Sequence, residues 1–147
     1  MRKFAYSMQN ILNLQYKFEE QEKAAFREAM LKLQNEEDTL KQYIAQKNTY
    51  EEQLKQEVTG TVDLKTVLQY RKSIDVMRSR IRSQMIKVHL EEKNVESARV
   101  KLQQEMKKRK THEVMREKAL QNYMYEMAVE EAKEIDETVS YKHSTMN

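Results

Sequence analysis

The chain has 147 residues, of which 35% are charged and 39% hydrophobic, and 27 Lys and Arg against 24 Asp and Glu give a net charge of +3. It holds one glycine, no proline and no cysteine, so it lacks the turn residues that a sheet protein, a barrel or a multi-domain chain requires. The absence of cysteine excludes disulfides, thiolate zinc sites and thiol nucleophiles. No apolar run approaches the roughly 18 residues of a membrane span, and the N-terminus lacks the apolar core of a signal peptide. These counts predict an all-α cytoplasmic protein made of long helices.

The first predicted helix covers about residues 2–58. Its apolar residues recur at steps of three and four, which is the heptad spacing of a coiled coil. The earlier part of this stripe includes two consecutive four-residue steps, a stutter that locally unwinds a supercoil. The predicted stripe runs through Phe4, Ile11, Leu14, Phe18, Ala25, Ala29, Met30, Leu33, Leu40, Ile44, Leu54 and Val58, with polar Glu37, Lys47 and Glu51 between them.

Gly60 marks the one sharp turn that the sequence predicts, at residues 59–63. A glycine there suits the left-handed conformation that ends many helices, and Asp63 is a candidate N-cap for the next helix. Two helices joined by one short turn run antiparallel and bury their apolar stripes on each other. We therefore predict a single domain, residues 1–147, folded as an antiparallel coiled-coil hairpin.

The second predicted helix covers about residues 64–140, with a frayed tail at 141–147. Nine of the eleven members of its stripe are apolar: Val67, Tyr70, Ile74, Met77, Ile81, Gln84, Val88, Glu91, Val95, Ala98 and Leu102. A further four-residue step to Met106 predicts a register shift, followed by Val114, Leu120, Met124, Met127, Ile135 and Val139. Because this helix is the longer one, its end is expected to extend beyond the first helix.

Charge is distributed unevenly along the chain. Residues 1–58 hold 9 basic and 10 acidic side chains, residues 59–122 hold 16 and 8, and residues 123–147 hold 2 and 6. The second helix is therefore basic with an acidic end, and its densest basic clusters are residues 71–87 and 107–110. Such a face can be solvated and paired with glutamates of the other helix, or it can bind an acidic protein surface, nucleic acid or anionic lipid.

Nothing in the sequence indicates a catalytic or metal site. His89, His112 and His143 are 23 and 31 residues apart, which places them roughly 35 and 45 Å apart along a helix. There is no glycine-rich phosphate loop or nucleophile elbow, and two packed helices cannot wall a pocket. We predict no enzymatic activity, no cofactor and no metal.

Tyrosine and methionine are unusually frequent, with 8 and 10 residues. Tyr43 and Tyr50 are one heptad apart and share a helix face, and Tyr70 follows the turn. Tyrosine suits surfaces that are half wet and half in contact with a partner, and methionine suits adaptable surfaces. Packing at the flank of the coil and a partner interface both explain Tyr43 and Tyr50.

Several local features together resemble one known family. They are the opening Phe4 with Ile11-Leu12-Asn13-Leu14, the single turn near Gly60, and Asp63-Leu64 leading into Tyr70, Ile74 and Met77, followed by Ala98-Arg99 and the acidic ending at residues 130–139. Over nearly its whole length the chain resembles the FliJ family, small cytoplasmic components of bacterial flagellar type III secretion.

The resemblance implies an antiparallel coil similar to the central stalk of rotary ATP synthases. It implies that the protein promotes assembly and activity of the export ATPase (FliI) ring and contacts the cytoplasmic domain of the export gate (FlhA) and the export chaperones, peripherally at the cytoplasmic face of the membrane. By motif position, the stalk role maps onto Phe4, Ile11, Phe18, Lys133, Asp136 and Glu137, and the gate or chaperone surface onto Tyr43, Tyr50 and Tyr70. Ser73, beside Ile74, departs from the aromatic that is frequent in the family.

Two other functions remain open on the sequence alone. A structural or tethering coiled coil could homodimerise through its stripe, although the polar members Glu37, Lys47, Glu51, Gln84 and Glu91 disfavour tight self-association of that kind. Residues 71–110 could bind nucleic acid, although they form no known module and contain four glutamates that would repel phosphate: Glu91, Glu92, Glu96 and Glu105.

Overall fold

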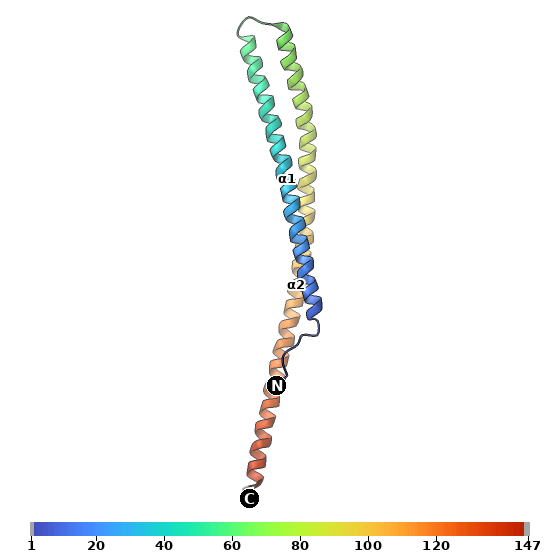
Figure 1. Ribbon diagram of the computed structural model, residues 1–147, viewed down its shortest axis with the longest axis vertical. Coiled ribbons are helices and arrows are strands. Elements are labelled where there is room, and N and C mark those ends of the chain that lie inside the picture. Colours follow the sequence, from blue (N-terminus) through green and yellow to red (C-terminus); the bar gives the residue numbers. More distant parts are fainter. Residues whose placement is uncertain (1, 146–147) are drawn as a thin grey trace. The chain divides into compact units, whose positions relative to one another are not determined.

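The computed structural model describes residues 2–145, which form two α-helices and, within that range, no β-strand. Helix α1 spans Gln9–Val58 and helix α2 spans Leu64–Thr145. The two helices pack against each other in opposite directions and are joined by one turn at residues 59–63 (Figure 1). The predicted all-α helical hairpin, with its turn near residues 59–63, is confirmed.

The chain packs as two compact units. The hairpin unit is Glu22–Leu102, and the terminal unit combines Met1–Gln21 with Gln103–Asn147. Each unit contains part of α1 and part of α2, and in each the two helical parts pack on each other. The single-domain organisation inferred from the sequence stays a prediction.

Local hydrogen bonds account for the turn. The Thr59 hydroxyl donates to the Gln56 carbonyl (2.8 Å), which satisfies one of the free acceptors at the end of α1. The Asp63 carboxylate accepts hydrogen bonds from the Lys65 backbone N–H (3.2 Å) and the Thr66 hydroxyl (2.8 Å). Asp63 is thus the N-cap of α2, as the sequence predicted.

Gly60 does not adopt the left-handed conformation that we expected. No residue in the described range, glycine included, has a positive φ. A Cβ built on Gly60 would have nothing within 4 Å, so neither backbone conformation nor space requires glycine here. The cap at Asp63 and the Thr59 hydroxyl direct the turn instead.

The α2 stripe of the hairpin unit follows the prediction. Ile74, Met77 and Val88 form the apolar core together with buried Gln84, and every other predicted member from Val67 to Leu102 is half-buried. The Gln84 side-chain amide donates to the Glu36 carbonyl (2.9 Å) and to the Glu36 carboxylate, so even the polar member of the core is paired across the hairpin.

The α1 stripe of the hairpin unit differs from the prediction at several positions. Four predicted members are exposed: Ala25, Met30, Ile44 and Val58. Next to three of them, a neighbouring residue is half-buried instead: Phe26, Tyr43 and Glu57. Beside Met30, Ala29 is half-buried as predicted. Leu33, Leu40, Lys47 and Leu54 are half-buried as expected. Residues one position apart lie about 100° apart around a helix. Which of two neighbouring α1 residues faces inward therefore depends on the α2 side chains opposite.

Both helix ends also differ from expectation. Helix α1 begins at Gln9 and not near residue 2, because Phe4 packs on Tyr123 (ring centroids 5.5 Å apart) and the Tyr123 hydroxyl donates to the Arg2 carbonyl. These contacts hold residues 2–6 outside the helix. Helix α2 continues to Thr145, so residues 141–145 of the expected frayed tail are helical, and residues 146–147 lie outside the described residues. Lys142 and His143 are in its last turn, where cations interact favourably with the helix dipole.

None of the helices in the described part of the chain contains an apolar stretch of membrane-spanning length.

Candidate functional site

The terminal unit buries polar side chains where the sequence predicted apolar ones. Leu12, Gln15 and Glu19 are buried on α1. We expected the residues directly before them to point inward, but Ile11, Leu14 and Phe18 are exposed by 43%, 48% and 42%. The predicted stripe of the first 20 residues is therefore wrong by one helix position.

The reason lies in the segment of α2 that faces them. The predicted register shift to Met106 does not occur, since Met106 is exposed. The three-four spacing continues past Leu102 through half-buried Glu105, Arg109 and Arg116. Inward charged groups need hydrogen-bonding partners, so α1 presents Gln15 and Glu19 to them beside buried Leu12. Ile11, Leu14 and Phe18 then lie outward.

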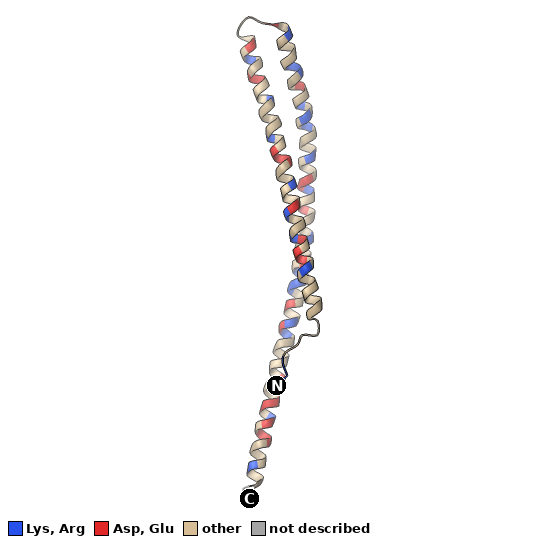
Figure 2. Cartoon of the chain, viewed as in Figure 1, with Lys and Arg blue, Asp and Glu red and all other residues tan. Residues whose placement is uncertain are grey.

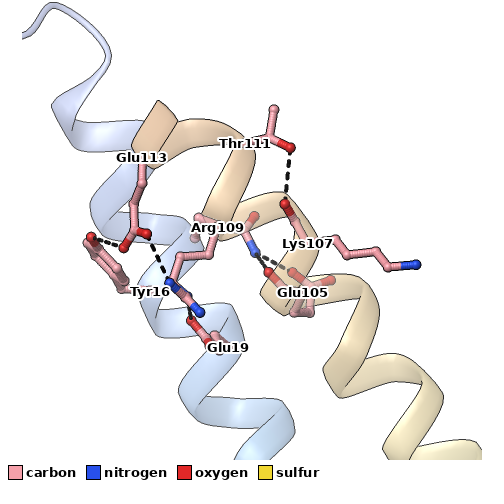
Figure 3. A network of polar contacts seen from close by, with 8 residues as sticks. Tyr16, Glu19, Glu105, Lys107, Arg109, Thr111 and Glu113 are labelled. Atoms are coloured by element: carbon pink, nitrogen blue, oxygen red, sulfur yellow. Dashed lines mark hydrogen bonds and ion pairs between the residues drawn. The ribbon is translucent and has the colours of Figure 1, made fainter. Parts of the chain in front are cut away.

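A network of polar contacts joins the two helices here (Figure 3). The Gln15 amide donates to the Glu105 carbonyl (3.1 Å) and carboxylate (2.6 Å). The Arg109 guanidinium donates through Nη1 to Glu113 (2.9 Å), and its Nε lies 2.6 Å from the Glu19 carboxylate in an ion pair whose geometry is not that of a hydrogen bond. Arg109 thus links a carboxylate on each helix.

A second cluster lies nearer the N-terminus. Arg116 donates to the Gln9 side-chain oxygen (2.8 Å), and its guanidinium lies over the Phe4 ring at 5.4 Å. Phe4 is therefore held between Arg116 and Tyr123, by cation–π and aromatic contacts that are typically worth about 0.5–1.5 kcal/mol each. The non-helical residues 2–6 are tied to α2 by this cluster.

Polar pairs of this kind specify register more than they add stability. A slip of either helix in the terminal unit would separate Gln15 from Glu105 and Glu19 from Arg109, and would leave buried donors and acceptors unpaired. The network therefore determines which faces of the terminal unit remain outward.

The hydrogen bonds shift the pKa values of several groups in this network. The pKa of Glu105 is lowered, chiefly by the Gln15 amide and then by Lys108. The pKa of Glu113 is lowered by the Tyr16 hydroxyl, which donates to it at 2.8 Å, and by Arg109. The same hydrogen bond raises the pKa of Tyr16. Ionised glutamates and a neutral tyrosine are thus favoured in the folded terminal unit.

Acid should weaken the terminal unit. Because the folded-state pKa values of Glu105 and Glu113 are lowered, their stabilisation is present above the ordinary glutamate pKa of about 4.3 and is lost as pH falls through the folded-state values. We expect a melting temperature several degrees lower at about pH 3 than at about pH 7, and a smaller difference in the Glu113→Gln variant, followed by circular dichroism. Glu117→Gln, an exposed change on the same helix, is the control, and identical pH dependence in both variants and the parent would contradict this assignment.

The C-terminal segment of α2, residues 128–145, is exposed on all sides. It nevertheless carries large apolar side chains, with Ile135 and Val139 exposed by 64% and 60%. Acidic residues outnumber basic ones in the same segment, and Figure 2 colours them red along this end of α2. This part of the helix has an apolar stripe and no partner within the described residues.

The site residues predicted from the sequence fall into three groups. Ile11 and Phe18 share an exposed face of α1, and Lys133, Asp136 and Glu137 are exposed on the C-terminal segment. Phe4 is half-buried against Tyr123. Tyr43, Tyr50 and Tyr70 are half-buried in the hairpin unit. Tyr43 and Tyr50 lie on the inward side of α1.

Sequence reasoning missed the polar network of the terminal unit. Its members are Gln15, Tyr16, Glu19, Glu105, Arg109 and Glu113. One signal was present: the heptad spacing of α2 continues from Leu102 without interruption if polar residues are accepted as inward. Among residues 2–145 no group of three or more His, Cys, Asp or Glu side chains could hold a metal ion.

Comparison with known proteins agrees with this architecture. A solved structure described as a YscO homologue from Chlamydia trachomatis is 18% identical, covers 97% of this chain and 96% of its own, and superposes with a TM-score of 0.59. At that identity it supports the fold. No curated protein sequence matches. The family described as Flagellar FliJ protein matches residues 4–147, so the chain belongs to the FliJ family and is a component of a flagellar type III secretion apparatus.

Proposed function

We propose that this protein is the non-catalytic, stalk-like partner of the flagellar export ATPase (FliI) ring, and that it promotes assembly and activity of the ring. We further propose that it links the ring to the cytoplasmic domain of the export gate (FlhA) and to export chaperones, at the cytoplasmic face of the membrane at the flagellar base. The observation that carries the proposal is the C-terminal segment of α2, which has an apolar stripe and no partner within the described residues.

An exposed amphipathic helix of this kind favours binding. Isolated helices gain little stability in water, and an apolar stripe gains most by packing on another surface. Ile135 and Val139 lie four residues apart on one side of the helix, with Glu131 and Glu134 beside them. The stalk residues implied by the resemblance, Lys133, Asp136 and Glu137, are exposed in the same segment.

The first helix contributes a second exposed surface to the terminal unit. Ile11, Leu14 and Phe18 are spaced by three and four residues and lie on one face. The polar network turns these side chains outward by placing Gln15 and Glu19 inward. In the proposed stalk, Ile11 and Phe18 contact the ring, and Phe4 supports the terminal unit through Tyr123.

The hairpin unit is the proposed contact for the gate or the chaperones. Tyr43, Tyr50 and Tyr70 are half-buried, so their exposed edges alone are available to a partner. A groove of about 800 Å³ near the turn is lined by apolar Leu54 and Val58 and by basic Arg71 and Arg78, among others. Glu51 and Asp75 also line the groove and pair with Arg78, so its surface is apolar and of mixed charge.

Mixing the purified chain with the export ATPase of its own organism tests the proposal. A stalk can change the activity of a ring only by binding its states with different affinity. We expect faster phosphate release and more hexamer when the chain is present. An active ATPase whose rate and oligomeric state are unchanged by the chain would support a tethering coiled coil instead.

The basic run on α2 should strengthen ring binding. Lys107, Lys108 and Lys110 are exposed, whereas Arg109 belongs to the inward network. Reversing the three lysines to glutamate should weaken ATPase binding at low salt by roughly tenfold or more, and the difference from the parent should shrink as salt rises, since exposed charges are screened.

The matched control reverses three exposed lysines of the hairpin unit, Lys41, Lys55 and Lys65. Binding to the ATPase can be followed by surface plasmon resonance at several salt concentrations. Equal weakening by both triple variants would show that net charge, and not the run at residues 107–110, governs the interaction.

A further inference from the structure

The outer face of α2 in the hairpin unit has a composition that its fold does not require. Ile74, Ile81 and Val88 recur every seven residues on the inward side of α2. The heptad position opposite to them is exposed and includes no acidic residue: Lys72, Ser79, Ile86, Lys93 and Val100. We call these residues, with neighbouring Arg82, Ser83, Leu90 and Ser97, the outer face. Ile86 is exposed by 72% and Leu90 by 56%.

The positive charges of the outer face are not neutralised by neighbours. The acids that border it are already paired, Asp75 with Arg78 (3.8 Å) and Glu96 with Arg99. Arg82 and Lys93 form no ion pair within residues 2–145. Figure 2 shows Lys and Arg recurring along this part of α2.

Two of the three apolar side chains of the outer face are grouped. Ile86 and Leu90 lie one helical turn apart, about 6 Å along the axis, with Arg82 before them and Lys93 after them. Single exposed aliphatic residues are ordinary. An apolar pair between two unpaired cations, however, is complementary to a helix whose apolar stripe is bordered by carboxylates.

The chain itself contains such a helix. In the C-terminal segment, an apolar stripe with steps of three and four residues runs through Ala128, Ala132, Ile135 and Val139, all of them exposed. Glu131 and Glu134 border it on one side and Asp136 on the other. Residues 123–147 hold 6 acidic and 2 basic side chains, which is the complement of the outer face.

We propose that the outer face of α2 binds the acidic C-terminal segment of a second copy of this chain. The outer face and the segment belong to the same uninterrupted helix, so the segment has to come from another molecule. This self-association does not rest on the proposed function. Its consequence is that a bound segment is covered, so self-association competes with any other partner of Ile135 and Val139.

We assign an antiparallel arrangement to the two helices, in which Glu131 meets Lys93. With Ile135 against Leu90, an antiparallel segment places Val139 against Ile86 and Glu131 beside Lys93. Lys142 then falls opposite Ser83 and next to Arg82. A parallel arrangement with Ile135 against Ile86 would place Glu131 opposite Arg82 and Lys142 opposite Lys93, so the Lys93 and Glu131 variants distinguish the two arrangements. So small a contact makes the association weak and sensitive to salt.

Sedimentation velocity of the full chain, over a range of concentrations at low and high salt, measures the association. We expect reversible self-association that Ile86→Glu weakens by about tenfold or more, because it places a carboxylate against the acidic segment. Met85→Glu, a change at an adjacent residue with 56% exposure, is the matched control and should have little effect. A chain that stays monomeric at all concentrations and salts would overturn the proposal.

A charge swap identifies the occupant. Lys93→Glu and Glu131→Lys should each weaken self-association. An equimolar mixture of the two variants should restore part of it, since the lysine introduced in one copy then meets the glutamate introduced in the other. The proposal fails if mixing restores nothing. It also fails if the parent is monomeric and binds DNA or anionic vesicles in a manner lost in Lys93→Glu, since the occupant would then carry phosphate.

The absence of cysteine from the chain allows a direct geometric check. Leu90→Cys in one copy and Ile135→Cys in another should form a mixed disulfide under mild oxidation, in excess over either homodimer. If the main product were instead the disulfide that joins two copies of the Leu90→Cys variant, two outer faces would lie together and the assignment would be overturned.

Discussion

Replacing Met77 by aspartate should unfold the hairpin unit. Met77 is 2% exposed and lies in the core with Ile74 and Val88. A carboxylate at this position would be buried among apolar side chains, at a cost of several kcal/mol. The free energy of unfolding of small proteins is about 5–15 kcal/mol, so the cost of this one substitution is comparable to the total stability. Far-ultraviolet circular dichroism should show a large loss of helix at room temperature.

Val76→Asp is the matched control for this experiment. Val76 precedes Met77 on α2 and is exposed by 44%, so an aspartate there keeps its hydration. Val and Asp have similar helix propensities, and surface changes usually alter the free energy of unfolding by about 0.5 kcal/mol or less. Equal loss of helix in the two variants would contradict the assignment of the α2 stripe to the core.

Ending the chain after Met127 should abolish stimulation of the export ATPase. The deletion removes residues 128–147, and those of them that the structure describes are exposed on every side. The polar network and the Phe4–Tyr123 contact lie before the cut, so both units should keep their folds and the melting temperature should change by a few degrees at most. Phosphate release by the ATPase, with and without the truncated chain, is the measurement.

A full-length variant separates the loss of the apolar stripe from the loss of length. Ile135→Glu with Val139→Glu should reduce stimulation nearly as much as the deletion, because it removes the apolar contact and adds charge. Thr138→Glu with Thr145→Glu adds the same charge without removing an aliphatic side chain and should be milder. Full stimulation by the truncated chain would remove the C-terminal segment from the proposed function.

Several features followed from local sequence alone. The α2 stripe between Val67 and Leu102 was predictable because nine of its eleven members are apolar, and burial of such a stripe dominates helix pairing. Asp63 was recognisable as an N-cap because its carboxylate serves the backbone N–H groups that directly follow it. The acidic ending and the single turn were sufficient to indicate the FliJ family, which the match over residues 4–147 confirms.

The terminal unit could not be predicted in this way. On one helix, Glu105, Arg109 and Arg116 look like solvated charges, and Ile11, Leu14 and Phe18 look like a core. The structure reverses both, because the polar side chains of α2 find partners in Gln9, Gln15 and Glu19 across the interface. Whether a charged residue lies inward depends on the partner opposite it, and that information is not local.

The sequence by itself therefore determined the helical class, the position of the turn, the apolar core that α2 contributes to the hairpin unit, and the family. Tertiary structure alone decided where α1 begins, since the contact of Phe4 with Tyr123 joins residues 119 positions apart. It also decided which faces of the terminal unit are outward. Apolar periodicity is a property of one helix, whereas the pairing of buried polar groups is a property of two, and only the second fixes the exposed surface that a partner can bind.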